Sequence, residues 1–272
     1  MKNDFIPVIN RIPIDKHPNG LTLIPLADAH YGSAEFNETL WHKTIKRIQD
    51  DPDCYCCLVG DLIDNTLKSS PGSVFEATAS PGEQKEWLYN ELLPIKDKVL
   101  GAVGGNHERR TGKEADQDPL YDVMLRLGRE DVYRPNICFM QIRMTYIAAD
   151  KQKGRDKAVR QRVAFSFAIT HGAGGGQYIG SSANRVQNFG MAIEGIDCLI
   201  TAHTHKPVTF PVTKLLFNNG TIVRKQFVVA VASSFLNYGG YPVQKLLPPT
   251  AQTTTEIMMS WSGTDGRIRV MQ

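Results

Sequence analysis

The first half of the sequence alternates short apolar runs with stretches of helical periodicity, and this alternation constrains the fold more than any other feature. The predicted strands are 21–27, 54–59 and 99–104, and the predicted helices are 36–49, 80–95 and 118–128. Strands that alternate with capped, amphipathic helices are typical of a mostly parallel sheet with helices on its faces. We therefore expect an α/β fold.

The second half is richer in strands. Strands are predicted at 137–147, 163–170, 196–202, 208–216, 222–235, 255–261 and 267–271, with one helix near 182–194. A sandwich of two mixed sheets with helices outside accommodates this many strands. Because the sequence shows no repeat, no low-complexity tract and no clear linker, we expect a single domain over residues 1–272.

Composition favours a soluble globular protein, because 42% of the 272 residues are hydrophobic and 22% are charged. The N-terminal segment lacks an apolar core of signal-peptide length, and no stretch is long enough to cross a bilayer, so we expect a cytoplasmic protein without membrane contact. Three of the five cysteines crowd into 54–57 without a matching Cys or His pair, so we interpret them as buried apolar side chains.

Metal-binding residue types follow five of the predicted strands directly. These are Asp28 and His30; Asp61 and Asp64; Asn106 and His107; His171; and His203 and His205. Each cluster alone is as typical of a turn or a surface histidine as of a site. Ligands of open α/β sheets bind at the carboxyl ends of the strands, so five clusters in this position predict one shared site.

The residue types favour a divalent metal such as Mn, Fe or Zn. They are too many for one tetrahedral zinc, which takes about four ligands, but they suffice for two metals that share a bridge. Asp61 is the candidate bridge, and Asp64 would orient a ligand or brace the loop.

The series Asp28-x-His30, Gly60-Asp61-x-x-Asp64, Gly105-Asn106-His107-Glu108, His171 and His203-x-His205 resembles the five motifs of the calcineurin-like metallophosphoesterases. The resemblance extends from residue 21 to about residue 207. It implies two facing mixed β-sheets flanked by helices, a four-layer α/β/β/α sandwich, with a dinuclear centre at the strand ends.

The resemblance also implies roles for single residues. One metal would be held by Asp28, His30, Asp61 and His205, and the other by Asp61, Asn106, His171 and His203. His107 would face the substrate phosphate without binding metal. Ala27 and Ala202 replace the Ser and Gly that are common in the family, but neither change removes a ligand. Asp64 stands where purple acid phosphatases have a metal-binding Tyr, so we expect a manganese, iron or zinc centre, manganese first.

Two metals would clamp a phosphate ester and activate a bridging hydroxide for direct attack on phosphorus. His107 would donate a proton to the leaving oxygen or stabilise its charge, so Asp61 and His107 are the predicted catalytic residues. Arg109 and Arg110 follow His107 directly, and they are either substrate-binding residues or a solvated pair of charges.

The basic run at 150–162 predicts an exposed hairpin tip, which is either a solvated loop or a contact for nucleic acid. With the net charge of +3, this run favours phosphodiesters of nucleic acid or nucleotides as substrates. A phosphomonoesterase acting on a small molecule is the alternative. A non-catalytic metal-binding scaffold is less favoured, because every ligand position is occupied by a suitable residue. The sequence does not predict the oligomeric state.

Overall fold

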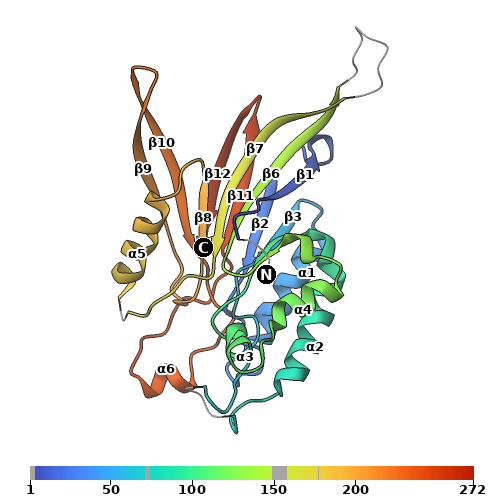
Figure 1. The fold of residues 1–272 in the computed structure, drawn as a ribbon, viewed down its shortest axis with the longest axis vertical. Helices are drawn as coiled ribbons and strands as arrows, with labels where there is room; N and C mark the ends of the chain where they lie inside the picture. Colours follow the sequence, from blue (N-terminus) through green and yellow to red (C-terminus); the bar gives the residue numbers. More distant parts are fainter. Residues whose placement is uncertain (1–3, 71–73, 149–157, 177) are drawn as a thin grey trace.

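Two six-stranded mixed sheets face each other in the computed structural model, which describes residues 4–70, 74–148, 158–176 and 178–272 (Figure 1). Sheet A has the order β1-β6-β7-β8-β10-β9, and sheet B has the order β12-β11-β2-β3-β4-β5. The strands of sheet A are β1 (Val8–Pro13), β6 (Ile137–Ala148), β7 (Ala158–Thr170), β8 (Cys198–Thr201), β9 (Val208–Asn218) and β10 (Thr221–Val231). Those of sheet B are β2 (Leu21–Leu26), β3 (Cys54–Leu58), β4 (Val99–Val103), β5 (Tyr133–Arg134), β11 (Glu256–Ser262) and β12 (Asp265–Met271).

Helices flank the two sheets. They are α1 (Glu38–Asp50), α2 (Pro81–Leu92), α3 (Glu108–Ala115), α4 (Pro119–Arg126), α5 (Ile179–Met191) and α6 (Gly240–Gln244). Helices α1, α2 and α4 gather beside sheet B, and α5 packs on β9 and β10 of sheet A (Figure 1). The predicted two-sheet sandwich flanked by helices is therefore confirmed.

Side-chain caps fix the helix starts that the sequence indicates. Asn37 accepts a hydrogen bond from the backbone N–H of Leu40, at the start of α1. Ser80 and Glu83 form a complete capping box, with Pro at the first position of α2. These caps satisfy backbone N–H groups that the first helical turn leaves without partners.

The two sheets approach each other closely around Gly101 of β4. A Cβ atom at this position would lie 3.1 Å from Sδ of Met140 and 3.3 Å from Cδ1 of Ile169, in β6 and β7. The inter-sheet core continues through Phe165 and Phe167, which are buried. A second cluster, around Phe227, fills the space between sheet A and α5.

Parallel pairing brings the ends of the key strands to one edge. Strands β2, β3 and β4 are mutually parallel in sheet B, and β7, β8 and β10 are mutually parallel in sheet A. Strands from 208–272 complete both sheets, because β10 pairs with β8 and β11 pairs with β2.

Some details differ from the sequence-based expectation. Strands β1 and β5 and helices α3 and α6 were not predicted, and the strand expected at 222–235 ends at Val231. The cysteines of 54–57 are buried on β3, as expected.

The basic run at 150–162 falls between β6 and β7. These two strands pair along their length, but residues 149–157, which include most of the run, lie outside the described residues. Among the described residues, no helix is long and apolar enough to span a membrane.

Candidate metal centre

Backbone hydrogen bonds join the loops that follow β2 and β3. The N–H of Asp28 donates to the carbonyl of Gly60 at 3.1 Å, and the N–H of His30 donates to that of Asp61 at 3.0 Å. A Cβ atom at Gly105, after β4, would overlap with the Asp61 carboxylate, so only glycine allows this approach. Three loops that are distant in sequence are thus held against one another.

Five residues of these strand ends have left-handed backbone conformations. They are Asp28 (φ 49°), His30 (φ 47°), Asp61 (φ 52°), His203 (φ 73°) and His205 (φ 55°). Positive φ is uncommon outside glycine and costs conformational energy. It persists where the surrounding structure fixes the backbone, and such residues cluster at functional sites.

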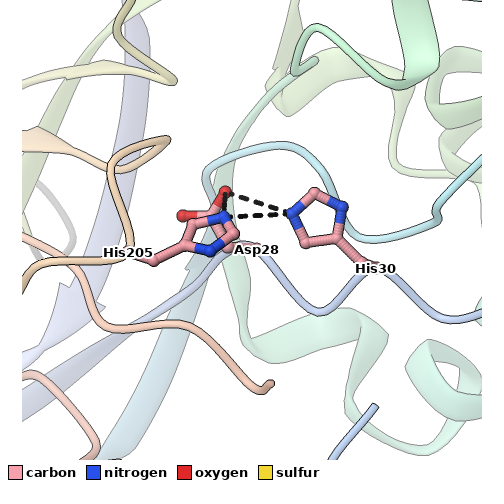
Figure 2. A group of neighbouring side chains, drawn as sticks. All are labelled: Asp28, His30 and His205. Atoms are coloured by element: carbon pink, nitrogen blue, oxygen red, sulfur yellow. Dashed lines mark hydrogen bonds and ion pairs between the residues drawn. The ribbon is translucent and has the colours of Figure 1, made fainter. Parts of the chain in front are cut away.

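Asp28, His30 and His205 form one group (Figure 2). The two imidazole rings face each other, with 3.1 Å between Nε2 of His30 and Nε2 of His205. Oδ1 of Asp28 lies 3.3 Å from Nε2 of His205 and 3.7 Å from Nε2 of His30. Three potential ligand atoms therefore converge on one point.

Asp61, His171 and His203 form a second group, and Asn106 lies beside it. Nδ1 of His171 lies 2.7 Å from the carbonyl oxygen of Val59, so Nδ1 carries a proton, and in the neutral form of the ring Nε2 presents its lone pair. Nε2 faces Oδ2 of Asp61 at 3.1 Å, Nδ1 of His203 at 3.2 Å and Oδ1 of Asn106 at 3.0 Å.

The carboxylate of Asp61 lies between the two groups. Its Oδ2 is 3.1 Å from Nε2 of His171 in the second group and 4.0 Å from Nε2 of His30 in the first. The other oxygen, Oδ1, accepts the backbone N–H of His107 at 2.8 Å. One oxygen is thus anchored while the other faces both groups.

In Asp28, as in Asp61, one carboxylate oxygen accepts a backbone N–H and the other faces histidine nitrogens. The second oxygen shows whether these residues fit a metal. Oδ2 of Asp28 accepts the backbone N–H of His203 at 2.9 Å, whereas its Oδ1 is buried and accepts no hydrogen bond from the residues that the structure describes. A buried carboxylate oxygen without a partner is costly. Because this atom faces the nitrogens of His30 and His205, the donor set fits a divalent cation.

The charges in the group depend on one another. Burial opposes ionisation of Asp28, but the nearby His205, His30 and His171 together outweigh it and hold the pKa of this carboxyl well below its usual range. Burial also opposes the charge on His171, yet the Asp61 carboxylate raises the pKa of His171 to about 9. Burial lowers the pKa of His30 to about 4, so this imidazole is neutral near pH 7. In the metal-free protein, a proton on His171 therefore competes with metal.

His107 lies beside both groups without belonging to either. Nδ1 of His107 donates a hydrogen bond to the backbone carbonyl oxygen of Asp64 at 2.7 Å. The side-chain Oδ1 of Asp64 lies 3.3 Å from Nδ1 of His107 and 3.9 Å from Nδ1 of His30. Nη2 of Arg110 donates to Nε2 of His107 at 2.9 Å. Burial opposes the charge on His107, but Asp64 and Asp61 outweigh it and raise the pKa of His107.

The structure separates the two arginines that follow His107. Arg110 is half-buried and contacts the imidazole of His107. Arg109 is exposed, and its guanidinium donates to the carbonyl oxygens of Gly104 at 3.0 Å and Pro135 at 3.3 Å. Part of its hydrogen-bonding capacity is thus used by the backbone, and its role in substrate binding stays a prediction.

Two buried residues that the sequence-based prediction did not single out hold these loops in place. Glu108 accepts the backbone N–H groups of Asp61 and Gly105, each at 2.9 Å, and that of Leu62 at 2.8 Å. Asn65 donates to the carbonyl oxygen of His107 at 2.7 Å. Each follows a predicted site residue directly, and Glu108 also closes the motif Gly105-Asn106-His107-Glu108.

Comparison with known families agrees with this geometry. The model of the calcineurin-like phosphoesterase family matches residues 21–207, which contain all five motifs. No curated protein matches the chain closely enough to be counted as a relative. The matched region covers more than half of the chain and ends just after His205, so the protein belongs to the calcineurin-like phosphoesterase family.

Proposed function

We propose that the protein hydrolyses phosphate esters with two divalent metal ions, manganese first and iron or zinc as alternatives. One site would use Asp28, His30, Asp61 and His205, and the other Asp61, Asn106, His171 and His203. The position of Oδ2 of Asp61, within 4.0 Å of ring nitrogens from both groups, carries this proposal. A single carboxylate oxygen there suits a shared ligand.

When bound, divalent cations would neutralise phosphate oxygens and acidify water. The chain's own groups would orient the metal ligands: the N–H groups of His107 and His203 each bind one carboxylate, and the Val59 carbonyl sets the tautomer of neutral His171. Attack by water would release the alcohol without a covalent enzyme intermediate. Hydrolysis in oxygen-18 water tests this step, because label absent from the product phosphate would exclude direct attack.

His107 would act as the proton donor to the leaving oxygen. Its Nε2 accepts a hydrogen bond from Arg110, so protonation at Nε2 requires the guanidinium to turn away. A substrate phosphate would favour this turn, since arginine binds phosphate oxygens with its planar fork of donors. Substrate binding and protonation of His107 are therefore coupled in the proposal.

Phosphodiesters of nucleotides or nucleic acid are the preferred substrates in this proposal. The described part of the basic run, residues 158–162, lies at the start of β7, and the length of this strand limits how that part could contribute. Ala158, the first residue of β7, precedes Thr170 by twelve residues of strand, or about 40 Å. Thr170 directly precedes His171, so only a polynucleotide of comparable length could touch both ends. A small nucleotide would use the centre alone.

A paired assay tests the proposal. Manganese-loaded protein is offered bis-p-nitrophenyl phosphate and p-nitrophenyl phosphate, with and without EDTA, while metal content is measured in parallel. Chelator-sensitive turnover that favours the diester is expected. Preference for the monoester would replace the diester by a small phosphomonoester. Two bound metals without turnover of either ester would favour a scaffold and contradict catalysis.

A further inference from the structure

A cavity of about 410 Å³ opens in the loop between β3 and α2. It is lined by Thr66, Leu67, Lys68, Val74, Ala77, Ala79, Ser80 and Pro81. Its volume lies within the range of roughly 300–1,000 Å³ that is typical of small-molecule sites. Most of its lining residues are aliphatic, so its walls suit a compact apolar group.

A hydrogen bond of Thr66 links the wall of the cavity to the candidate metal centre. The hydroxyl of Thr66 donates to Oδ2 of Asp64, whose Oδ1 lies 3.3 Å from Nδ1 of His107. Asn65, between them in the chain, is fully buried and is bonded to the His107 carbonyl oxygen. One wall of the cavity is therefore fixed relative to the proposed proton donor.

Among the described polar side chains of the cavity wall, the ammonium group of Lys68 is the one left to bind a ligand. The hydroxyl of Thr66 is bonded to Asp64, and the hydroxyl of Ser80 donates to Glu83 at 2.7 Å. Lys68 is exposed and forms no hydrogen bond or ion pair with any residue that the structure describes. The cavity thus offers a ligand aliphatic walls and one ammonium group.

We propose that this cavity binds the leaving group of the phosphate ester. The leaving group would be a compact ring that carries an anionic substituent, and this substituent would pair with Lys68. The inference rests on the proposed function, because it places the alcohol on the same side as His107, which would protonate the leaving oxygen. A nucleoside that carries a second phosphate belongs to this chemical class.

Replacement of the charge tests the pairing. Phenyl phosphate and 4-carboxyphenyl phosphate are compared, each also as its methyl diester, with Lys68→Ala and with Lys43→Ala on α1 as the matched control. Lys68→Ala should lower kcat/KM for the carboxyphenyl esters by about two- to fivefold, as for an exposed ion pair, and leave the phenyl esters unchanged. Equal effects on both ring types, or none, would overturn the pairing.

Filling the cavity tests the position of the ring. Ala79→Phe should lower kcat/KM for the aryl esters by more than about tenfold while turnover of methyl phosphate persists, and the exposed Ala192→Phe should change neither. A loss that is equal for aryl and methyl esters would overturn the assignment, as would no loss for either.

A binding measurement separates this inference from the proposed function. 4-Hydroxybenzoate, the alcohol released from the carboxyphenyl ester, is titrated into metal-free protein by calorimetry. Binding that Lys68→Ala weakens by about two- to fivefold supports the cavity as an anion-and-ring site even if no ester is hydrolysed, in which case the proposed function alone fails. Binding that is absent, or that Lys68→Ala leaves unchanged, overturns the cavity assignment whether or not esters are hydrolysed.

Discussion

The backbone N–H of His107 donates to Oδ1 of Asp61 at 2.8 Å, which ties the proposed proton donor to the proposed bridging carboxylate. The loops after β3 and β4 supply one residue each. The position of His107 relative to the centre is therefore set by the backbone, whereas its protonation is left to Asp64 and Arg110.

Asp61→Asn should remove the shared ligand. An amide oxygen is neutral and a weaker ligand for a divalent metal, so metal content should fall from two per chain to one or none, and activity by at least about 100-fold. Elemental analysis after gel filtration measures the first quantity, and Asp50→Asn on α1 is the control. Two tightly bound metals in Asp61→Asn would contradict the bridging role.

His107→Gln should separate catalysis from metal binding. The two metals should stay bound, and kcat should fall by about 10²- to 10⁴-fold, the usual contribution of a general acid. The loss should be smaller for esters whose alcohol is strongly acidic, because such leaving groups need no proton. Steady-state kinetics over a series of substituted phenyl esters would reveal this trend, and an equal loss for all of them would argue against proton donation.

The metal-free protein should lose stability as the pH rises through the pKa of His171. That pKa is raised from 6.5 to about 9, so the folded state retains a proton that the unfolded chain releases. The resulting stabilisation is complete below about pH 6.5, disappears as the pH passes 9, and is of the order of 3 kcal/mol. Urea unfolding after chelation measures it.

His171→Gln supplies the comparison for that measurement, because it lacks the titrating group. The free energy of unfolding should fall more steeply between pH 6.5 and 9 in the metal-free wild type than in the variant. Added manganese should flatten the wild-type profile, since metal takes the place of the proton. Parallel profiles for the two metal-free proteins would refute the assignment.

The cysteines should be inert in the folded protein. All five are buried without a disulfide, and burial raises the pKa of Cys54 and of Cys138 to about 12. Iodoacetamide at pH 8 should therefore modify none of them in the native state and all five in guanidinium chloride. Intact-mass spectrometry counts the adducts, and rapid labelling of one thiol without denaturant would show that a strand opens locally.

The sequence predicts the strand ends of the site well because each combines two signals, an apolar run and a ligand cluster. It does not predict α3, because residues 108–115 are almost all polar and offer no large apolar side chain to mark a buried helix face. Contacts with a distant loop stabilise that segment, because the carboxylate of Glu108, at its start, accepts backbone N–H groups of residues 61 and 62. Such long-range bonds are not encoded by local pattern.

The two arginines show a similar limit. Arg109 and Arg110 are adjacent and chemically identical, so the sequence offers no reason to separate them. Successive residues of a helix point in directions about 100° apart, and α3 therefore directs Arg110 to His107 and Arg109 to the carbonyl oxygens of Gly104 and Pro135. Strand β1 was not predicted because Pro7 precedes it and Pro13 ends it, and because its partner, β6, lies more than a hundred residues away.

The left-handed backbone conformations at the strand ends cost stability at the same positions that supply the proposed metal ligands. Replacing His203 or His205 by glycine would relieve a backbone conformation that glycine adopts freely, and would also delete a proposed ligand. Selection for heat resistance alone would therefore tend to erode these positions. For this protein, a high melting temperature in a variant is a poor guide to whether its chemistry survives.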